Sequence, residues 1–189
     1  KITGINSRWQ DLTDLQVINN SDLVISTIGS WAEERQLNDF MLKSQKFPPI
    51  LFGWTDKFAY SGHALVIFKD SNGCFACGVD YMGPKLKLID WKGIPINKEP
   101  NSCGIFNPYG AIELSKISAM IADTAVEILS GEISKAKHKM WLSSKEKIEL
   151  KGGELVYNLA KLNITNNKTE VMFEVDLEKD TKCTACNNI

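Results

Sequence analysis

The chain has 189 residues, which is long enough to bury one sizeable hydrophobic core without disulfide bonds. Lys and Arg number 22 and Asp and Glu number 23, so the net charge of -1 gives no basic surface that would predict nucleic-acid binding. No apolar run reaches the roughly 18 residues that span a bilayer, and an odd count of five cysteines does not favour a secreted disulfide framework. These bounds predict a cytoplasmic globular protein with no nucleic-acid or membrane partner. The chain starts at Lys1 without an initiating methionine, and we interpret it as a piece of a longer protein.

Three short apolar runs in the first half of the chain are typical of buried strands: residues 23–27, a run that begins at residues 50–52, and residues 63–68. Between the first two runs, Ser30 and Glu33 match a capping box, with Ser30 as the N-cap of a helix. That helix is expected to end before Pro48, because proline cannot continue it. A strand, a helix and further buried strands in this order predict an α/β fold with a mostly parallel sheet covered on both faces.

The longest predicted helix has Asn107 as its N-cap and Pro108 at its first helical position, and it runs to about Leu129 before Gly131. Most of its residues are apolar, and a helix that is apolar on most sides is buried in a core or in a subunit interface. We therefore expect either cover from the rest of the chain or a homodimer built on this helix.

The last third of the chain carries strand-like runs at residues 140–142 and 171–175, separated by lysine-rich turns and by Gly152 and Gly153. It contains no repeat and no low-complexity tract. We therefore divide the chain into residues 1–131 and a β-rich C-terminal extension over residues 132–189.

Two Cys-x-x-Cys motifs, which we call hooks, lie far apart in the sequence: Cys74 with Cys77, and Cys183 with Cys186. Four thiolates in two hooks are a complete tetrahedral ligand set for zinc, with no open position for a substrate. The pattern predicts a structural zinc ion that joins the middle of the chain to its C-terminus. Free thiols without a metal are the alternative.

Cys103 is the one cysteine outside the hooks. It lies four residues before the predicted N-cap at Asn107, in a segment with Pro, Asn and Gly, and the positive end of a helix lowers a thiol pKa. This position favours a reactive nucleophile, and a free cysteine without a role is the alternative. His63 and His138 do not obviously converge with Cys103, so a Cys-His hydrolase is not favoured. His63 begins a buried strand and is expected to be a hydrogen-bonded core histidine, and a binding role beside Gly62 is the alternative.

The order of these features resembles the C-terminal half of the ThiF/MoeB and ubiquitin-activating superfamily. The features that carry the resemblance are a strand at residues 22–25, a helix with Gln36-Leu37-Asn38, a strand at residues 49–51, the first hook, the lone cysteine, a proline-containing helix start, a long apolar helix that ends in Leu129-Ser130-Gly131, and the second hook. The segment from Gly53-Trp54 to Ser61-Gly62-His63-Ala64 resembles the bacterial ThiF-type activating enzymes of antiphage and ubiquitin-like conjugation operons more than the sulfur-carrier activators.

The resemblance implies a Rossmann-like adenylation fold, usually a homodimer, which activates the C-terminal carboxylate of a partner protein with ATP and Mg and passes it to a cysteine. Residues 1–131 would then be the C-terminal half of the adenylation domain, and residues 132–189 a zinc-stapled extension. Cys103 occupies the place of the transfer cysteine, which accepts the partner as a thioester.

This sequence departs from the family in its nucleotide site. It contains no G-x-G-x-x-G or Walker-type loop, so the nucleotide-binding half is expected elsewhere and the chain alone is expected to be inactive. The sulfur-carrier activators carry an acidic residue just after the first strand, where this chain has none. The residues that match this stretch, and that we predict to contact the nucleotide, are Ser26, Thr27, Gly29 and Ser30. A strand-to-helix turn can still present backbone N–H groups to an anion, and an ordinary capped helix is the alternative.

The sequence therefore predicts part of an ATP-dependent bacterial activating enzyme that adenylates the C-terminus of a ubiquitin-like or other protein and accepts it on Cys103. One alternative is a non-catalytic, zinc-stapled dimerisation or docking module. Another is a sulfur-carrier adenylyltransferase of the ThiF/MoeB type.

Overall fold

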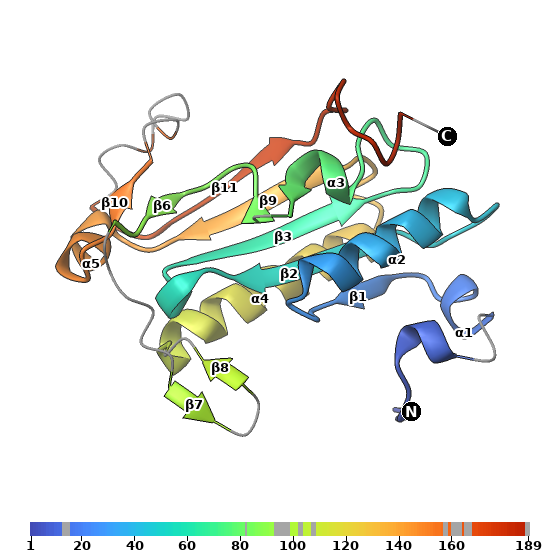
Figure 1. Cartoon of the computed structure of the whole chain (residues 1–189), viewed down its shortest axis with the longest axis horizontal. Helices are drawn as coiled ribbons and strands as arrows, with labels where there is room; N and C mark the ends of the chain where they lie inside the picture. Colours follow the sequence, from blue (N-terminus) through green and yellow to red (C-terminus); the bar gives the residue numbers. More distant parts are fainter. Residues whose placement is uncertain are drawn as a thin grey trace.

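The computed structural model describes residues 1–12, 16–81, 83–92, 99–101, 104–106, 109–156, 159, 164 and 168–187. Its centre is a five-stranded sheet that runs across the molecule (Figure 1). In spatial order the strands are β1 (Val24–Ser26), β2 (Ile50–Thr55), β3 (Ser61–Ile67), β9 (Lys137–Leu142) and β11 (Val171–Asp176). Strands from both sides of residue 131 share this sheet, so the β-rich C-terminal region continues it.

The sheet is mixed, and the prediction of a mostly parallel sheet is wrong. β1 and β2 are parallel, whereas the pairs β2–β3, β3–β9 and β9–β11 are antiparallel. Parallel neighbours need a crossover connection, which helix α2 (Trp31–Lys43) supplies between β1 and β2. Residues 56–60 alone separate β2 from β3, and so short a connection permits only an antiparallel pair.

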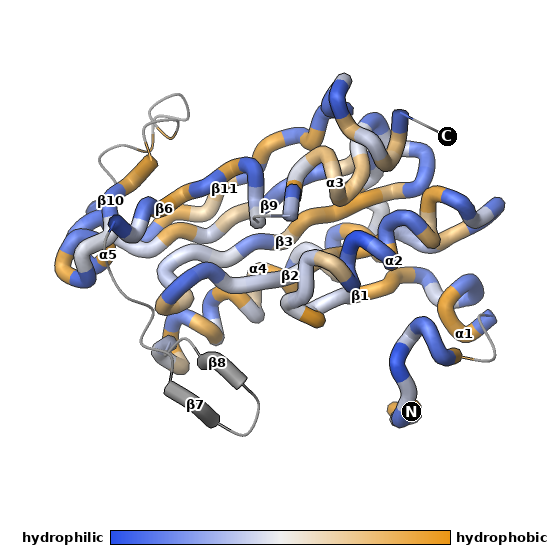
Figure 2. The backbone as a smooth tube through the Cα atoms, in the orientation of Figure 1, coloured by the Kyte–Doolittle hydropathy of each residue, from blue (hydrophilic) through white to orange (hydrophobic). Residues whose placement is uncertain are grey.

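Two helices cover opposite faces of the sheet, as predicted. Side chains alternate between the two faces along a strand. On one face Phe52 and Leu65 pack with Leu37 of α2. On the other face Leu51 and Val66 belong to the core that packs against α4 (Ala111–Leu129). Every residue of β3 is buried, and hydrophobic stretches mark the strands of the sheet (Figure 2).

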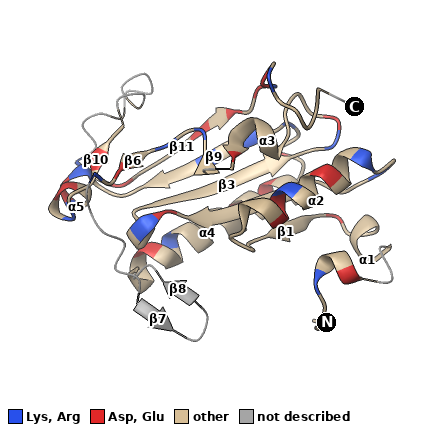
Figure 3. Cartoon of the chain, in the orientation of Figure 1, with Lys and Arg blue, Asp and Glu red and all other residues tan. Residues whose placement is uncertain are grey.

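Charged side chains lie outside the central strands. β2 and β3 contain no Lys, Arg, Asp or Glu, and the charged residues sit on the helices, the turns and the other strands (Figure 3). The polar side chains that do enter the core beside these strands are therefore few, and each needs a hydrogen-bond partner.

Helix α4 begins later than the sequence predicted. Its first residue is Ala111 and its N-cap is Gly110, whereas the predicted N-cap Asn107 lies outside the described residues. Its C-terminal end is as predicted, because Leu129 is the last helical residue and Gly131 has a φ of 81°. Glycine adopts this left-handed conformation without a steric penalty, so it ends the helix.

The remaining elements are short: the 3-10 helices η1 (Trp9–Asp11) and η2 (Lys57–Ala59), the helices α1 (Gln16–Asn19), α3 (Phe75–Gly78) and α5 (Lys145–Leu150), and the strands β4 (Val79–Asp80), β5 (Gly83–Pro84), β6 (Ile89–Asp90), β7 (Glu99–Asn101), β8 (Gly104–Phe106) and β10 (Glu154–Leu155). Antiparallel pairs join β4 with β5, β6 with β10 and β7 with β8. A separate apolar cluster packs β9 and β11 against α5 and β6. Among the described helices, none is both long enough and apolar enough to cross a bilayer.

Candidate functional site

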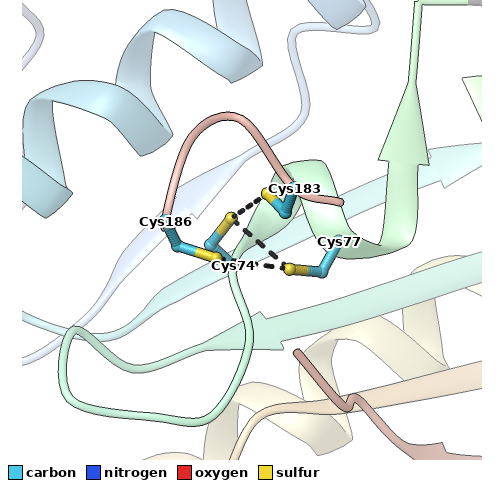
Figure 4. Close-up of side chains that lie close together, drawn as sticks. All are labelled: Cys74, Cys77, Cys183 and Cys186. Atoms are coloured by element: carbon cyan, nitrogen blue, oxygen red, sulfur yellow. Dashed lines mark hydrogen bonds between the residues drawn. The ribbon is translucent and has the colours of Figure 1, made fainter. Parts of the chain in front are cut away.

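The four hook cysteines lie together, as the sequence predicted, although corresponding cysteines of the two hooks are 109 positions apart in the sequence (Figure 4). The Sγ atom of Cys74 is 3.8 Å from that of Cys77 and 3.7 Å from that of Cys183. The Sγ atoms of Cys77 and Cys186 are 3.6 Å apart. Four sulfurs held tetrahedrally at about 2.3 Å from a zinc ion are about 3.8 Å from one another. The spacing therefore fits a metal ion such as zinc, and it is too long for a disulfide bond.

The first hook is built on one helical turn. Cys74 is the N-cap of α3, and the N–H of Cys77 donates to its carbonyl at 2.9 Å. The flanking residues Gly73 and Gly78 lie against Leu177, which follows β11. A Cβ atom at either glycine would come within about 3.2 Å of Leu177, so a larger residue there would push the segment after β11 slightly away from the hook.

The environment of the cluster also favours a cation. Cys74 is fully buried, and Cys77 and Cys183 are nearly so. Burial and the three neighbouring thiols raise the pKa of Cys74, and burial raises the pKa of Cys186 to about 11. Burial also opposes ionisation of Cys183, but backbone polar groups of Cys186 and Ala185 lower its pKa to about 7. Without a positive charge Cys74 and Cys186 therefore resist becoming thiolates, and a divalent metal ion would supply that charge.

Helix α2 contacts both hooks. The Asn38 side chain is fully buried, and its Oδ1 accepts a hydrogen bond from the backbone N–H of Phe75 at 2.9 Å. One turn earlier on the same helix, Arg35 donates to Oγ1 of Thr184 in the second hook at 3.3 Å and lies over the ring of Tyr81. The cysteine cluster is therefore joined by hydrogen bonds to α2, the helix that connects the parallel strands β1 and β2.

The four predicted nucleotide contacts lie at the other end of this crossover, in what we call the β1–α2 turn, residues 26–30: Ser26, Thr27, Gly29 and Ser30. Gly29 has a φ of 71°, which reverses the chain there. Ser30 is the N-cap of α2, as predicted, but its side chain makes no capping hydrogen bond. The predicted capping box is therefore not formed, and Glu33 pairs instead with Arg8 at 3.0 Å.

A carboxyl group that the sequence analysis missed lies under this turn. Glu34 of α2 is fully buried, and Ser26 Oγ donates to its Oε1 at 3.3 Å. The other carboxyl oxygen, Oε2, is buried and has no hydrogen-bond partner among the described residues. Burial raises the pKa of Glu34 to about 7, against the opposite effect of the polar groups of Ser26, Ile28 and Gly29 near the carboxyl. The sequence signal was its spacing, because Glu34 precedes the buried residues Leu37 and Asn38 by three and four positions and so shares their helix face.

A second cluster of polar side chains lies in the core, where it connects the end of β2 with β3 and β9. Asp56 Oδ2 accepts hydrogen bonds from Ser61 Oγ at 2.6 Å and lies 2.9 Å from His63 Nε2. His63 Nδ1 lies 3.0 Å from His138 Nε2, and the ring of Trp54 stacks on His63. The prediction that His63 is a hydrogen-bonded core histidine is confirmed, whereas its contact with His138 was not predicted.

Burial and neighbouring groups set the protonation states of His138 and Asp56 in this cluster. Burial and the neighbouring His63 lower the pKa of His138 well below its ordinary value, so His138 is neutral. Burial opposes ionisation of Asp56, but His63 and the hydrogen bonds from His63 and Ser61 hold the pKa of Asp56 below its ordinary value. Asp56 therefore carries the charge, and a neutral His138 ends the chain of hydrogen bonds in the core.

The predicted transfer nucleophile, Cys103, lies outside the described residues, so its role stays a prediction.

Comparisons with solved structures support the fold class. No family model matches the sequence, and no curated protein sequence matches it. Among solved structures, the chain is similar to the crystal structure of E. coli MccB, with a TM-score of 0.50 and 10% identity over 97% of this chain and 43% of that chain. It is also similar to E. coli MccB with MccA-N7isoASN, with a TM-score of 0.49 and 12% identity over 97% of this chain and 45% of that chain. The chain thus spans less than half the length of the MccB chains.

MccB is an adenylating enzyme of the ThiF/MoeB type. The likeness to it supports a Rossmann-like fold, in agreement with the sequence, and at this identity it concerns the fold alone.

Proposed function

We propose that this chain is part of an ATP-dependent enzyme that adenylates the C-terminal carboxylate of a ubiquitin-like or other protein. The observation that carries the proposal is the MccB-like fold over 97% of the chain. The order of the sequence motifs led to the same superfamily independently of the backbone. Because one fold serves many functions, the proposal also needs a site, and the β1–α2 turn is the candidate.

The position of this turn supports a role in nucleotide binding. In open α/β sheets, ligands bind outside the carboxyl ends of the strands, and the turn follows the carboxyl end of β1, which is parallel to β2. β1 is an edge strand of the described sheet, and its Ile25 side chain is 51% exposed. We propose that the strands carrying the phosphate-binding loop, which this sequence lacks, join the sheet at this edge.

The proposed chemistry has two steps. The partner's carboxylate attacks the α-phosphorus of ATP, the bond to the bridging oxygen of the β-phosphate breaks, and pyrophosphate leaves with its Mg ion. The Cys103 thiolate then attacks the carbonyl carbon of the mixed anhydride, forming a thioester and releasing AMP. The hook cysteines take no part in either step, because a four-thiolate metal site has no open position.

A homodimer through α4 belongs to the same proposal. Two charged residues of α4 form ion pairs within the chain: Lys116 pairs with Glu170, and Glu127 pairs with Lys139 of β9. Its outer face keeps large apolar side chains in solvent: Ile112, Leu114, Val126 and Leu129. A nearly uncharged face of this kind is suited to a second copy of itself.

The test uses the full-length protein that contains these residues, with candidate partner proteins. We expect pyrophosphate exchange into ATP that depends on the partner, and a partner adduct that added thiols cleave by thioester exchange. The Cys103→Ala variant should keep the exchange and lose the adduct. An adduct that survives this substitution would assign the thioester to another residue, and absent exchange would contradict adenylation.

A non-catalytic docking module is the second candidate, favoured by the missing phosphate loop and the closed metal site. The same experiment separates the two functions. A docking module binds the partner with equal affinity whether or not ATP is present, and it exchanges no pyrophosphate.

A further inference from the structure

A carboxylate lies at the same end of the sheet as the β1–α2 turn. Asp56 directly follows β2, which ends at Thr55 and is parallel to β1. The carboxyl ends of parallel neighbours meet at one edge of a sheet, and ligands of open α/β sheets bind outside that edge. The turn itself, residues 26–30, contains no carboxylate. Asp56 therefore brings an acidic side chain to an edge where the turn supplies none.

The two oxygens of the Asp56 carboxylate have different surroundings. Oδ2 accepts a hydrogen bond from Ser61 Oγ at 2.6 Å and lies 2.9 Å from Nε2 of His63, which is fully buried. Oδ1 accepts no hydrogen bond from the described residues, and the Asp56 side chain is 27% exposed. The carboxylate is therefore held from the inside through one oxygen and can offer the other oxygen to a ligand.

The support of Asp56 continues into the core. An ionised carboxylate only accepts hydrogen bonds, so His63 donates to it from Nε2. Nδ1 of His63 lies 3.0 Å from Nε2 of His138, and the ring of His63 stacks on Trp54 with 4.7 Å between the ring centres. Trp54 in turn meets Trp31, the first residue of α2, edge to face at 5.4 Å. These contacts fix the imidazole ring and connect the carboxylate with the start of the helix that follows the β1–α2 turn.

This part of the structure departs from good packing and backbone geometry. β3 is buried along its whole length, and apolar side chains of similar size would avoid the cost of desolvating His63 and His138. The turn between β2 and β3 is strained, because Phe58 and Ala59 have φ values of 61° and 53°, which residues other than glycine rarely adopt. Departures of this kind concentrate at functional sites.

We propose that Asp56 binds a divalent cation through Oδ1, and that His63 is the positioning residue that holds the carboxylate for it. Carboxylate oxygens suit Mg²⁺, which is bound by one or two carboxylates together with the phosphates of a substrate. Carboxylates that bind a metal are in turn hydrogen-bonded, as Asp56 is by His63 and Ser61. The identity of this cation as the Mg²⁺ of ATP rests on the proposed function.

The test measures the affinity of the full-length protein for α,β-methylene-ATP, whose α–β bridge cannot be broken, with and without added Mg²⁺. In the unmodified protein Mg²⁺ should tighten the binding. Asp56→Asn keeps the shape of the side chain and removes its charge, so the gain from Mg²⁺ should fall on the order of tenfold. The affinity without Mg²⁺ should stay unchanged or rise, because a negative charge near the phosphates is gone. A merely structural role would lower both affinities.

Two further variants locate the effect. Asp70→Asn removes the same charge from an exposed turn beyond the other end of β3, so it should leave the gain from Mg²⁺ unchanged. His63→Phe keeps a ring against Trp54 and removes the hydrogen bond to Asp56, so it should lower the gain on the order of tenfold. If His63→Phe does not fold, Asp56→Asn decides alone.

The outcomes separate this inference from the proposed function. An Asp56→Asn protein that keeps the whole gain from Mg²⁺, or that loses affinity equally with and without Mg²⁺, would overturn the inference. Partner-dependent pyrophosphate exchange by the unmodified protein would still support the proposed function in that case. An unmodified protein that binds no nucleotide under either condition would contradict both the proposed function and the cation site.

Discussion

Glu34 and His138 are buried groups whose pKa values move in opposite directions, so pH should affect stability through them with opposite signs. Burial raises the pKa of Glu34 from 4.5 to about 7, so over this range the native state holds a proton that the unfolded chain releases. Its contribution to stability is fully present below about pH 4.5 and is lost as the pH rises through 7. A pKa change of this size corresponds to roughly 3 kcal/mol.

His138 acts in the other direction. The pKa of His138 is lowered well below 6.5. Below pH 6.5 the histidine is therefore protonated in the unfolded chain and neutral in the native state. Its contribution to stability is present above about pH 6.5 and is lost as the pH falls. One proton corresponds to a slope of at most about 1.4 kcal/mol per pH unit. The lowered pKa of Asp56 places its own effect at more acidic pH, below about 4.

The two slopes should largely cancel in the unmodified chain between about pH 4.5 and about pH 6.5, and single substitutions should separate them. As the pH falls through this window, the free energy of unfolding should decrease in Glu34→Gln and increase in His138→Gln. Urea denaturation followed by tryptophan fluorescence measures both, with zinc kept saturating and metal content checked at each pH. The surface carboxyls are the same in the two variants, so they do not contribute to the difference between the two pH slopes. Slopes of the same sign in both would refute the assignment of these two groups.

Three further predictions concern the metal, the assembly and the packing. Cys183→Ser should lose zinc and, because the metal closes a loop of 109 residues, lower the free energy of unfolding by about 5 kcal/mol. Lys182→Ser, on an exposed neighbour, should keep one zinc per chain by elemental analysis, and less than about half an equivalent in the unmodified chain would contradict a zinc site. Light scattering should give twice the chain mass, and Val126→Glu on the outer face of α4 should give the monomer, whereas an unmodified chain that is monomeric at micromolar concentration would exclude this interface. Gly62→Val should lower the unfolding free energy by about 1–3 kcal/mol in thermal denaturation, because its Cβ would overlap an isoleucine of α4, while Gly4→Val, with open space around it, should have no effect.

Local sequence signals predicted most of the elements. The strand at residues 24–26, the start of α2 after Ser30 and the end of α4 at Gly131 depend on residues a few positions apart, and all three are as predicted. The error in sheet direction had a different source. The order of strands and helices suggested parallel neighbours, but the length of the connection at residues 56–60 decides the direction, because no crossover fits into it.

Contacts between distant residues were predictable only where chemistry restricts the partner. Cys74 and Cys77 supply two of the four ligands of a tetrahedral metal site. The other two ligands could be predicted from the second Cys-x-x-Cys motif near the C-terminus. Nothing comparable links His63 to His138. Their contact depends on the register that places Leu65 opposite His138, and a slip of one residue would turn the histidine to the other face of the sheet. Periodicity can show that such a residue is buried, but the partner that makes its burial tolerable is set by the tertiary structure.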